Sequence, residues 1–507
     1  MLFLIALIAG AASAFAFQPF AIGPLMVLAI AVLCELIVRA PSLRRSLLIG
    51  WGFGVGQFCV GLNWIATAFT FQAAMPAWLG WIAVVLLSLY LAVYPMLAAA
   101  LAWTFGRTSR FALVLALAGG WTVTEWLRAT IFTGFAWNPV GVTLVDTPLL
   151  AASRFVGTYG LSALVVLLGG ALWLAWRREV RATAAALLVP VLLTFLPGPT
   201  LSDRPMAMPP VRIVQPNIGQ QDKWRPGFDA IAGERLANLS LVGPPVTPEL
   251  VFWPEAAVTE PLQDGRRGAE SAVEAERLRA TRTLNAGDIL LTGGLALQSA
   301  DGSGLTGATN SVFVMGPLGE ALGRYDKAHL VPYGEYLPMR PLLSAIGLSR
   351  LAPGDLDFAA GAGPQTIELP RGMGKIGFQL CYEIIFSGQV VDRAHRPDLL
   401  FNPSNDAWFG RWGPPQHLAQ ARLRAAEEAL PVIRSTPTGI SAFVGPAGEL
   451  YASLPWQKAG VIRATMPRAA IGLTPFARFG NLIPITVGFL LIAAAIALTY
   501  ARRYRRT

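Results

Sequence analysis

The chain has 507 residues, of which 54% are hydrophobic and only 14% are charged, and its mean hydropathy is +0.51. Soluble proteins carry about 25% charged residues, so this composition excludes an ordinary soluble protein and indicates one that crosses a membrane several times. The net charge of +10 does not indicate a nucleic-acid partner, because many arginines stand in clusters beside apolar runs and the sequence holds no nucleic-acid-binding motif.

Apolar stretches long enough to cross a bilayer recur through the first 200 residues and return once near the end. A membrane helix needs about 17–25 apolar residues to cross about 30 Å of hydrocarbon. The first stretch resembles the apolar core of a signal peptide, but no basic residues precede it and another apolar run follows directly, so a retained helix is expected. We therefore predict about eight spans, at residues 2–17, 21–39, 47–70, 79–104, 111–131, 158–176, 182–197 and 481–500.

Clusters of arginine follow every second predicted span. They are Arg39, Arg44 and Arg45; Arg107 and Arg110; Arg177, Arg178 and Arg181; and Arg502, Arg503, Arg505 and Arg506. Because basic residues gather on the cytoplasmic side, this alternation predicts that both termini are cytoplasmic and that the large polar block lies outside. In a bacterium that places the polar block in the periplasm, at the outer leaflet of the inner membrane.

The predicted organisation therefore has three parts: membrane helices one to seven over residues 1–199, a polar domain over 200–475, and a last membrane helix with a basic tail over 476–507. The fifth predicted span carries Glu125 and Arg128, three residues apart on one helical face. Charges inside a membrane suggest a functional role, but we favour an ion pair that fixes helix packing.

The polar block alternates predicted strands and helices, which indicates an α/β layered domain. The Pro-rich segment 196–210 is expected to be a linker from the membrane to this domain. The predicted strands are residues 211–214, 250–253, 289–292, 311–314, 376–380 and 399–401, and the predicted helices are 228–241, 269–284 and 416–430.

Three reactive side chains follow predicted strands in this block. Glu255 comes after Pro254, Lys327 stands in the stretch Tyr325-Asp326-Lys327-Ala328-His329, and Cys381 stands where a buried strand turns into a helical segment. A helix N-terminus beside a thiol favours the thiolate. If these groups meet, Glu255 can act as base for the thiol, while Lys327 and the backbone N–H of Tyr382 can stabilise an oxyanion.

Each of these residues also has an ordinary structural interpretation. Glu255 can cap a helix, Lys327 can be a surface charge, and most free cysteines are simply buried apolar residues. A Cys–His dyad that uses His329 or His417 is an alternative. The three histidines show no metal-ligand spacing. The other two cysteines, Cys34 and Cys59, lie in predicted spans, so a disulfide within the polar domain is excluded.

The three motifs around these residues resemble those of the carbon–nitrogen hydrolase (nitrilase) superfamily, whose catalytic set is Glu, Lys and Cys in that chain order. With the membrane helices, the whole chain resembles the bacterial apolipoprotein N-acyltransferase family. The motifs that carry the resemblance are Trp253-Pro254-Glu255, Tyr325-Asp326-Lys327, Cys381-Tyr382-Glu383, Val214-Gln215-Pro216-Asn217, Pro403-Ser404-Asn405-Asp406, Arg434-Ser435-Thr436 and Glu125-Trp126-Leu127-Arg128.

The resemblance implies an αββα domain inserted before the last membrane span and assigns roles to its residues. Glu255 is the implied general base, Lys327 the oxyanion stabiliser, Cys381 the nucleophile and Glu335 a second glutamate that positions them. Further residues implied to be needed for activity are Trp224, Tyr382 and Glu383.

The implied reaction moves an acyl chain from a membrane phospholipid, through a thioester on Cys381, to the N-terminal amine of an S-diacylglyceryl-cysteine apolipoprotein. No metal or organic cofactor is implied. The chain departs from the family pattern at Ala256, Tyr333 and Pro437, and none of these removes a reactive group. The apolar stretch 342–351 is expected to form a lipid-facing lid.

Two other functions are compatible with the motifs. The first is a membrane-tethered amidase or lipase-type hydrolase that passes the acyl group to water. The second is a transporter or scaffold whose enzyme-like domain is inactive.

Overall fold

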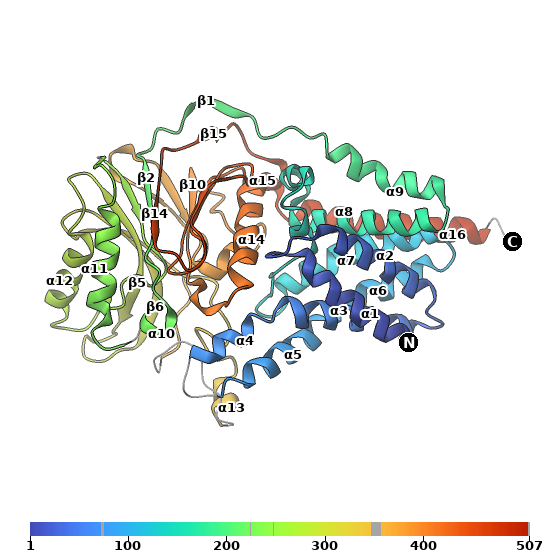
Figure 1. Ribbon diagram of the computed structural model, residues 1–507, viewed down its shortest axis with the longest axis horizontal. Helices are drawn as coiled ribbons and strands as arrows, with labels where there is room; N and C mark the ends of the chain where they lie inside the picture. Colours follow the sequence, from blue (N-terminus) through green and yellow to red (C-terminus); the bar gives the residue numbers. More distant parts are fainter. Residues whose placement is uncertain (72–75, 224, 247, 346–355, 505–507) are drawn as a thin grey trace.

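The apolar stretches near both ends of the chain form a helical bundle at one end of the molecule, and an α/β domain occupies the other end (Figure 1). The computed structural model describes residues 1–71, 76–223, 225–246, 248–345 and 356–504. The bundle helices are α1 (Leu2–Ser13), α2 (Gly23–Val38), α3 (Leu43–Gly61), α4 (Ile65–Ala68), α5 (Leu79–Leu91), α6 (Val93–Gly106), α7 (Arg110–Thr130), α8 (Ser153–Trp176), α9 (Val180–Leu193) and α16 (Leu482–Tyr504).

Among the described residues, three helical stretches are long and apolar enough to cross a membrane: Leu79–Gly106, Pro148–Trp176 and Leu482–Ala501. A fourth is added if Leu43–Gly61 and Ile65–Phe71, which meet at a bend of 47°, count as one span. The apolar helices Leu2–Ala16, Gly23–Val38 and Val180–Leu193 have only 10–17 residues. Three or four candidate spans therefore stand on length and composition, and the predicted total of eight stays a prediction.

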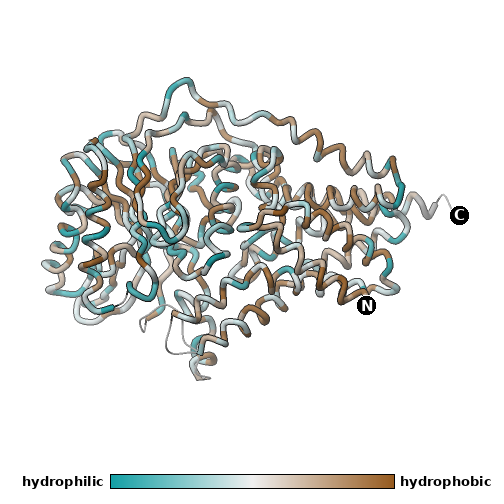
Figure 2. The backbone as a smooth tube through the Cα atoms, viewed as in Figure 1, coloured by the Kyte–Doolittle hydropathy of each residue, from teal (hydrophilic) through white to brown (hydrophobic). Residues whose placement is uncertain are grey.

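Close helix contacts in the bundle depend on small residues. A Cβ atom at Gly10 of α1 would lie 1.9 Å from the Phe53 carbonyl oxygen of α3, and one at Gly56 of α3 would lie 2.1 Å from the Leu7 carbonyl oxygen. Membrane helices gain most of their association energy from such close packing, because lipid provides no hydrophobic driving force between them. Apolar residues line the bundle along its length (Figure 2).

The α/β domain contains two sheets packed face to face. One sheet has the strand order β14-β2-β3-β5-β6-β7, with β4 beside β5, and the other has the order β13-β12-β11-β10-β9-β8. The strands of the first sheet are β2 (Val211–Gln215), β3 (Leu250–Phe252), β4 (Pro261–Asp264), β5 (Ile289–Gln298), β6 (Gly307–Met315), β7 (Ala321–Asp326) and β14 (Gly460–Ala464). Those of the second are β8 (Thr366–Glu368), β9 (Lys375–Phe378), β10 (Leu399–Pro403), β11 (Val432–Ser435), β12 (Ala442–Val444) and β13 (Leu450–Ser453).

Helices cover the outer face of each sheet, so the layers are helix, sheet, sheet and helix, as predicted. The strands in the middle are buried on both faces, and every residue of β2 and β10 is buried. Phe252 of β3 and Phe401 of β10 meet between the sheets with ring centroids 4.9 Å apart. The domain helices are α10 (Gln220–Lys223), α11 (Phe228–Ser240), α12 (Glu270–Thr281), α13 (Arg340–Ala345), α14 (Gly413–Glu428) and α15 (Pro475–Phe479).

The outer helix α14 lies between the second sheet and the bundle (Figure 1). One cluster of buried apolar residues joins the two parts, and it includes Leu400 of β10, Leu418 of α14 and the bundle residues Phe58 and Tyr159. The domain is therefore packed directly on the membrane helices.

The segment 196–210, predicted to be a linker, joins α9 to β2, and it contains strand β1 (Leu201–Pro205), which was not predicted. This strand pairs antiparallel with β15 (Arg468–Ala470), with Leu201 opposite Ala470. The chain leaves the bundle and returns to it at one place, so the two extended segments run side by side and satisfy each other's backbone hydrogen bonds. At the opposite end of the bundle, away from the domain, α1 begins and α16 ends (Figure 1).

Candidate active site

Cys381 stands at a sharp turn between β9 and the short 3-10 helix η6 (Cys381–Ile385). Its φ is +53°, in the left-handed region, which costs an L-residue about 1–3 kcal/mol when it is held there by its surroundings. Its side chain is buried, with 5% of the residue exposed. A strained, buried cysteine at the end of a strand agrees with the predicted strand-to-helix junction and makes Cys381 a candidate for a functional role.

The Glu383 carboxylate holds this turn to the segment that carries Lys327. It accepts hydrogen bonds from the backbone N–H of Leu380 at 2.6 Å, Ala328 at 2.8 Å and His329 at 2.9 Å. The Tyr325 hydroxyl donates to the same carboxylate at 2.9 Å. Burial raises the pKa of Glu383, and the backbone bonds and Lys327 oppose that rise. Glu383 therefore fixes the nucleophile turn relative to the end of β7.

Lys327 lies between two buried carboxylates. Its Nζ is 2.9 Å from Glu335 Oε1 and 3.6 Å from Glu255 Oε1. Only 1% of Lys327 is exposed. Burial alone would lower the pKa of Lys327, but Glu335, Glu255 and Cys381 outweigh that effect and hold it above its usual value. The lysine is therefore a fixed positive charge at neutral pH.

Asn310 on β6 was not predicted as a site residue, and it connects the two glutamates. Its side-chain amide donates to Glu255 Oε1 at 2.8 Å and to Glu335 Oε1 at 2.9 Å. The other oxygen of the base, Glu255 Oε2, is buried without a hydrogen bond among the described residues. The available signal for Asn310 was the run of three polar residues, Thr309-Asn310-Ser311, that precedes the apolar half of β6.

Burial raises the pKa of the Cys381 thiol well above its usual value, and the negative charge of Glu255 raises it further. Lys327 and the backbone N–H of Asn405 act in the opposite direction. The thiol is therefore protonated at neutral pH and needs a base before it can attack. The structure thus brings Glu255, Lys327 and Glu335 into contact and places the first two close enough to shift the thiol's pKa.

The histidines weighed as partners of Cys381 contact other groups. His417 Nε2 is 3.1 Å from the carbonyl oxygen of Cys381, and its Nδ1 is 3.0 Å from Asp406 Oδ1. His329 Nε2 is 2.8 Å from the carbonyl oxygen of Thr133. Both rings therefore bind the backbone, and within the described chain neither has a hydrogen bond with the sulfur.

The remaining predicted residues divide into two groups. Tyr382 is buried, and its hydroxyl donates to the carbonyl oxygen of Gly134 in the loop after α7 at 3.3 Å. Trp224 lies outside the described residues, as does most of the predicted lid over 342–351. The part of the lid that is described belongs to α13, where Leu342 is 62% exposed.

Glu125 and Arg128 form a buried ion pair at the domain-facing end of the bundle, with Arg128 Nη2 3.8 Å from Glu125 Oε1. Glu125 also accepts a hydrogen bond from the Val140 backbone N–H at 2.9 Å, and Arg128 donates to the Trp137 carbonyl oxygen at 2.9 Å. These bonds hold the chain that follows α7, in agreement with the packing role that we favoured.

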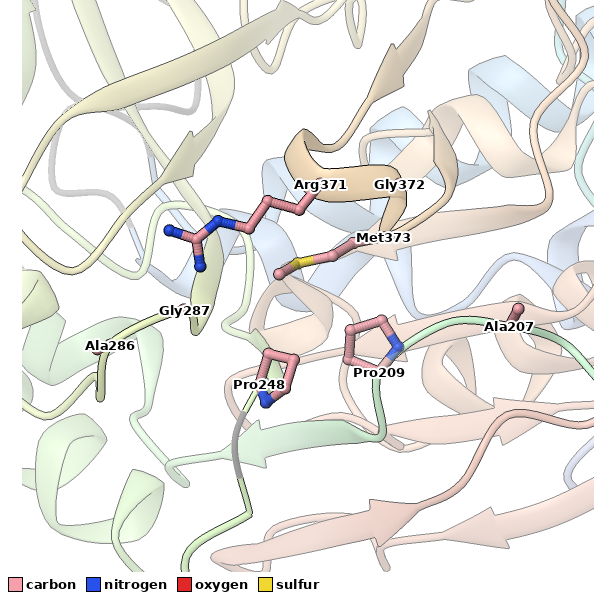
Figure 3. A pocket seen from close by; sticks show the side chains of 8 residues that line it. All are labelled: Ala207, Pro209, Pro248, Ala286, Gly287, Arg371, Gly372 and Met373. Atoms are coloured by element: carbon pink, nitrogen blue, oxygen red, sulfur yellow. The ribbon is translucent and has the colours of Figure 1, made fainter.

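A hollow of about 400 Å³ lies at the edge of the sheets where the parallel strands begin, and Arg371 is one of the residues that line it (Figure 3). It is lined by residues that precede β2, β3, β5 and β9, such as Pro209, Pro248 and Gly287. Glu255 and Cys381 instead follow β3 and β9. Because the parallel strands start at one edge and end at the other, this hollow is separate from the reactive cluster.

Comparison with known proteins agrees with the geometry. Residues 9–171 match the family profile described as the apolipoprotein N-acyltransferase N-terminal domain, and residues 245–476 match that of carbon-nitrogen hydrolase. An apolipoprotein N-acyltransferase of Bradyrhizobium diazoefficiens is 36% identical, over 99% of this chain and 95% of its own. One from Rhodopseudomonas palustris is 34% identical, over 98% and 95%. The chain therefore belongs to the apolipoprotein N-acyltransferase family.

Proposed function

We propose that this protein transfers a fatty acyl chain from a membrane phospholipid to the N-terminal amine of lipoproteins that carry an S-diacylglyceryl-cysteine. The observation that carries the proposal is the buried cluster of one thiol, one ammonium group and two carboxylates, in a domain packed against a bundle of apolar helices. Family membership supports the substrates, because the relatives are named for N-acylation of apolipoproteins.

The first half of the reaction forms a thioester. Glu255 takes the proton from the Cys381 thiol, and the sulfur attacks the ester carbonyl of the phospholipid. The resulting oxyanion is stabilised by the Lys327 ammonium and by the backbone N–H of Tyr382. The bond to the glycerol oxygen then breaks, that oxygen takes the proton from Glu255, and a lysophospholipid leaves.

The second half returns the enzyme to its starting state. The lipoprotein amine attacks the thioester carbonyl, and Glu255 takes a proton from the attacking nitrogen. The carbon–sulfur bond breaks, and the proton held by Glu255 passes to the leaving sulfur. Splitting the transfer into two steps means that two bulky lipids need not occupy the site together. Glu335 and Asn310 keep Glu255 and Lys327 in place throughout.

We also propose the membrane arrangement that this chemistry needs. The protein lies in the bacterial inner membrane with about eight spans, the catalytic domain in the periplasm and both termini in the cytoplasm. The alternating arginine clusters support this orientation. So does the position of α1 and α16, whose outer ends lie away from the domain (Figure 1).

The test is mass spectrometry of the full-length protein after incubation with phospholipid vesicles. We expect an acyl adduct on Cys381 that hydroxylamine removes, no adduct in Cys381→Ala, and loss of the adduct when a diacylated lipopeptide is added. An unmodified Cys381 in the wild-type protein would contradict the proposal. Release of free fatty acid at the same rate with and without the lipopeptide would instead identify a hydrolase.

A further inference from the structure

We propose that α14 positions the nucleophile turn on the membrane bundle, and that the contact between Thr158 of α8 and Glu427 of α14 sets this position. The inference rests on the proposed function, because it concerns how Cys381 reaches an acyl donor in the bilayer. Three sets of contacts carry it.

The first set joins α14 to the bundle. Helix α8 is broken at Gly157, which has φ +64° and ψ −177°, so a new helical run begins at Thr158. The Glu427 carboxylate accepts hydrogen bonds from the Thr158 backbone N–H at 2.5 Å and from its hydroxyl at 2.6 Å. A carboxylate is favoured at a helix N-terminus, where backbone donors lack partners. Here the cap for a bundle helix comes from the catalytic domain.

The second set joins the same end of α14 to the far end of the nucleophile turn. Arg424 Nε lies 2.7 Å from Glu427 Oε2, and Arg424 Nη1 donates to the carbonyl oxygen of Ile385 at 3.0 Å. The Ser387 hydroxyl donates to Glu427 Oε1 at 2.8 Å. Arg424 and Glu427 are both almost completely buried. Separating Arg424 from Glu427 would leave a buried charge without its partner, which is strongly destabilising. The two side chains are therefore expected to stay in contact.

The third set joins α14 to the nucleophile itself. His417 Nε2 donates to the carbonyl oxygen of Cys381 at 3.1 Å. The other ring nitrogen of His417 lies 3.0 Å from both Asp406 Oδ1 and Arg434 Nη2, and Arg434 also donates to Asp406. Burial and then Arg434 lower the pKa of His417, which keeps the ring neutral. The first and last carbonyls of η6 are thus both held by one helix.

A consequence distinguishes this role from simple support of the fold. A phospholipid ester can reach the sulfur only when Cys381 stands at the right height above the bilayer, whereas a small water-soluble reagent reaches it without regard to the membrane. Loosening the contact with α8 should therefore impair reaction with phospholipid and leave the intrinsic reactivity of the thiol unchanged.

The experiment compares two measurements on the full-length protein in phospholipid vesicles. The first is the rate of thioester formation on Cys381 from phospholipid, and the second is the rate of alkylation of Cys381 by iodoacetamide, both followed by mass spectrometry. For Thr158→Val we expect thioester formation to fall at least about tenfold, because the variant loses the hydroxyl's buried hydrogen bonds with two charged groups, Glu427 and Arg424. Alkylation should stay within about twofold of the wild type, since the contact does not touch the sulfur.

Two controls accompany this variant. Thr158→Ser keeps the hydroxyl and should match the wild type in both measurements. Asp146→Asn removes an ion pair with Arg422 across the same interface, and Asp146 is half exposed, so both rates should again be unchanged.

Either of two results would overturn the inference. One is a Thr158→Val protein that forms the thioester as fast as the wild type. The other is a parallel fall in both rates, which would show that the contact only supports the fold. A wild-type protein that forms no thioester would refute the proposed function and this inference with it, whereas an active wild type beside an equally active variant refutes the inference alone.

Discussion

At the scale of single residues, the site is built around a thiol that is difficult to ionise. Burial and Glu255 raise its pKa, and Lys327 only partly compensates. The same carboxylate that disfavours the thiolate is the group that can remove the proton, because its free oxygen Oε2 has no hydrogen bond among the described residues. We therefore expect Glu255 to take the thiol's proton as the sulfur attacks.

Glu255→Gln should change the pH dependence of acylation as well as its rate. At pH 7 we expect thioester formation to fall about 10²–10⁴-fold, the usual contribution of a general base. The amide removes one cause of the raised thiol pKa, so the residual rate should climb with pH between 7 and 10 as the thiolate fraction grows. The wild type should level off near neutral pH. Rates of adduct formation across this range test the prediction, and a flat profile for the variant would contradict it.

Sequence reasoning found Glu255, Lys327 and Cys381 because reactive side chains at strand ends are visible in the chain. The structure brings them together, and their catalytic roles stay predictions. Asn310 could not be found in this way, since its role depends on pairing between β6 and its neighbours. The strain at Cys381 was hidden for a similar reason, because backbone dihedrals follow from the surrounding packing.

At the scale of elements, the Glu383 carboxylate accepts backbone hydrogen bonds that no strand or helix accepts. Glu383 satisfies the backbone N–H groups of Leu380, Ala328 and His329, which belong to two segments that are distant in the sequence. Neither segment forms strand hydrogen bonds at this point, because Leu380 comes after the end of β9, and Ala328 and His329 come after the end of β7.

Glu383→Gln should therefore destabilise the protein far more than Tyr325→Phe. The amide turns one acceptor oxygen into a donor that faces other donors, and hydrogen bonds to a charged group contribute about 1.5–3 kcal/mol each. Tyr325→Phe removes a single hydroxyl donor to the same carboxylate, and we expect a loss of about 1.5–3 kcal/mol, the value of one such bond. Thermal unfolding of the purified variants in detergent, followed by circular dichroism, measures both. Equal shifts in Tm would contradict the prediction.

The break in α8 gives a second prediction at this scale. A Cβ at Gly157 would lie 2.2 Å from the Phe476 ring of α15, at a φ of +64°. Gly157→Ala should therefore cost about 3 kcal/mol, from backbone strain and overpacking together. Gly268→Ala has a similar φ of +80° with nothing within 4 Å, and should cost about 1 kcal/mol. The difference in Tm between the two variants isolates the contact between α8 and α15.

Most elements could be predicted from periodicity, and the errors have physical causes. The predicted span 158–176 begins at the break in α8 after Gly157, and the helical residues from Ser153 to Val156 that precede the break were not predicted. Strand β1, inside the predicted linker, was not predicted. A Pro-rich segment shows no strand pattern of its own, and β1 forms by pairing with β15. Helices α1, α2 and α9 are apolar but short. Length alone therefore does not show whether each of them crosses a membrane.

At the scale of the whole molecule, the catalytic domain and the bundle share one apolar core. Buried residues of β10, α14 and the bundle belong to the same cluster, and η6 contributes Tyr382, which reaches the loop after α7. The sequence could indicate two parts with different composition, but it could not show this contact, because no local pattern distinguishes an apolar face that meets a sheet from one that meets a membrane helix.

The proposed orientation predicts opposite accessibility for two exposed positions. Leu318 in the turn between β6 and β7 is 81% exposed, and Val180 at the start of α9 is 76% exposed. In intact cells whose outer membrane has been made permeable, a maleimide that does not cross the inner membrane should label Leu318→Cys. It should label Val180→Cys only after lysis. Labelling of Val180→Cys before lysis, with labelling of Leu318→Cys only after lysis, would contradict the proposed orientation.

The antiparallel ribbon of β1 and β15 brings the start and the end of the inserted domain to the same point. An inserted domain whose two ends are adjacent does not hold the flanking helices apart. Helices α9 and α16 can therefore lie as close together as two helices joined by a short loop. Removing the residues between the paired strands would therefore leave the ends of the two flanking helices close enough to join, but it would also expose the apolar surface that the bundle shares with the domain.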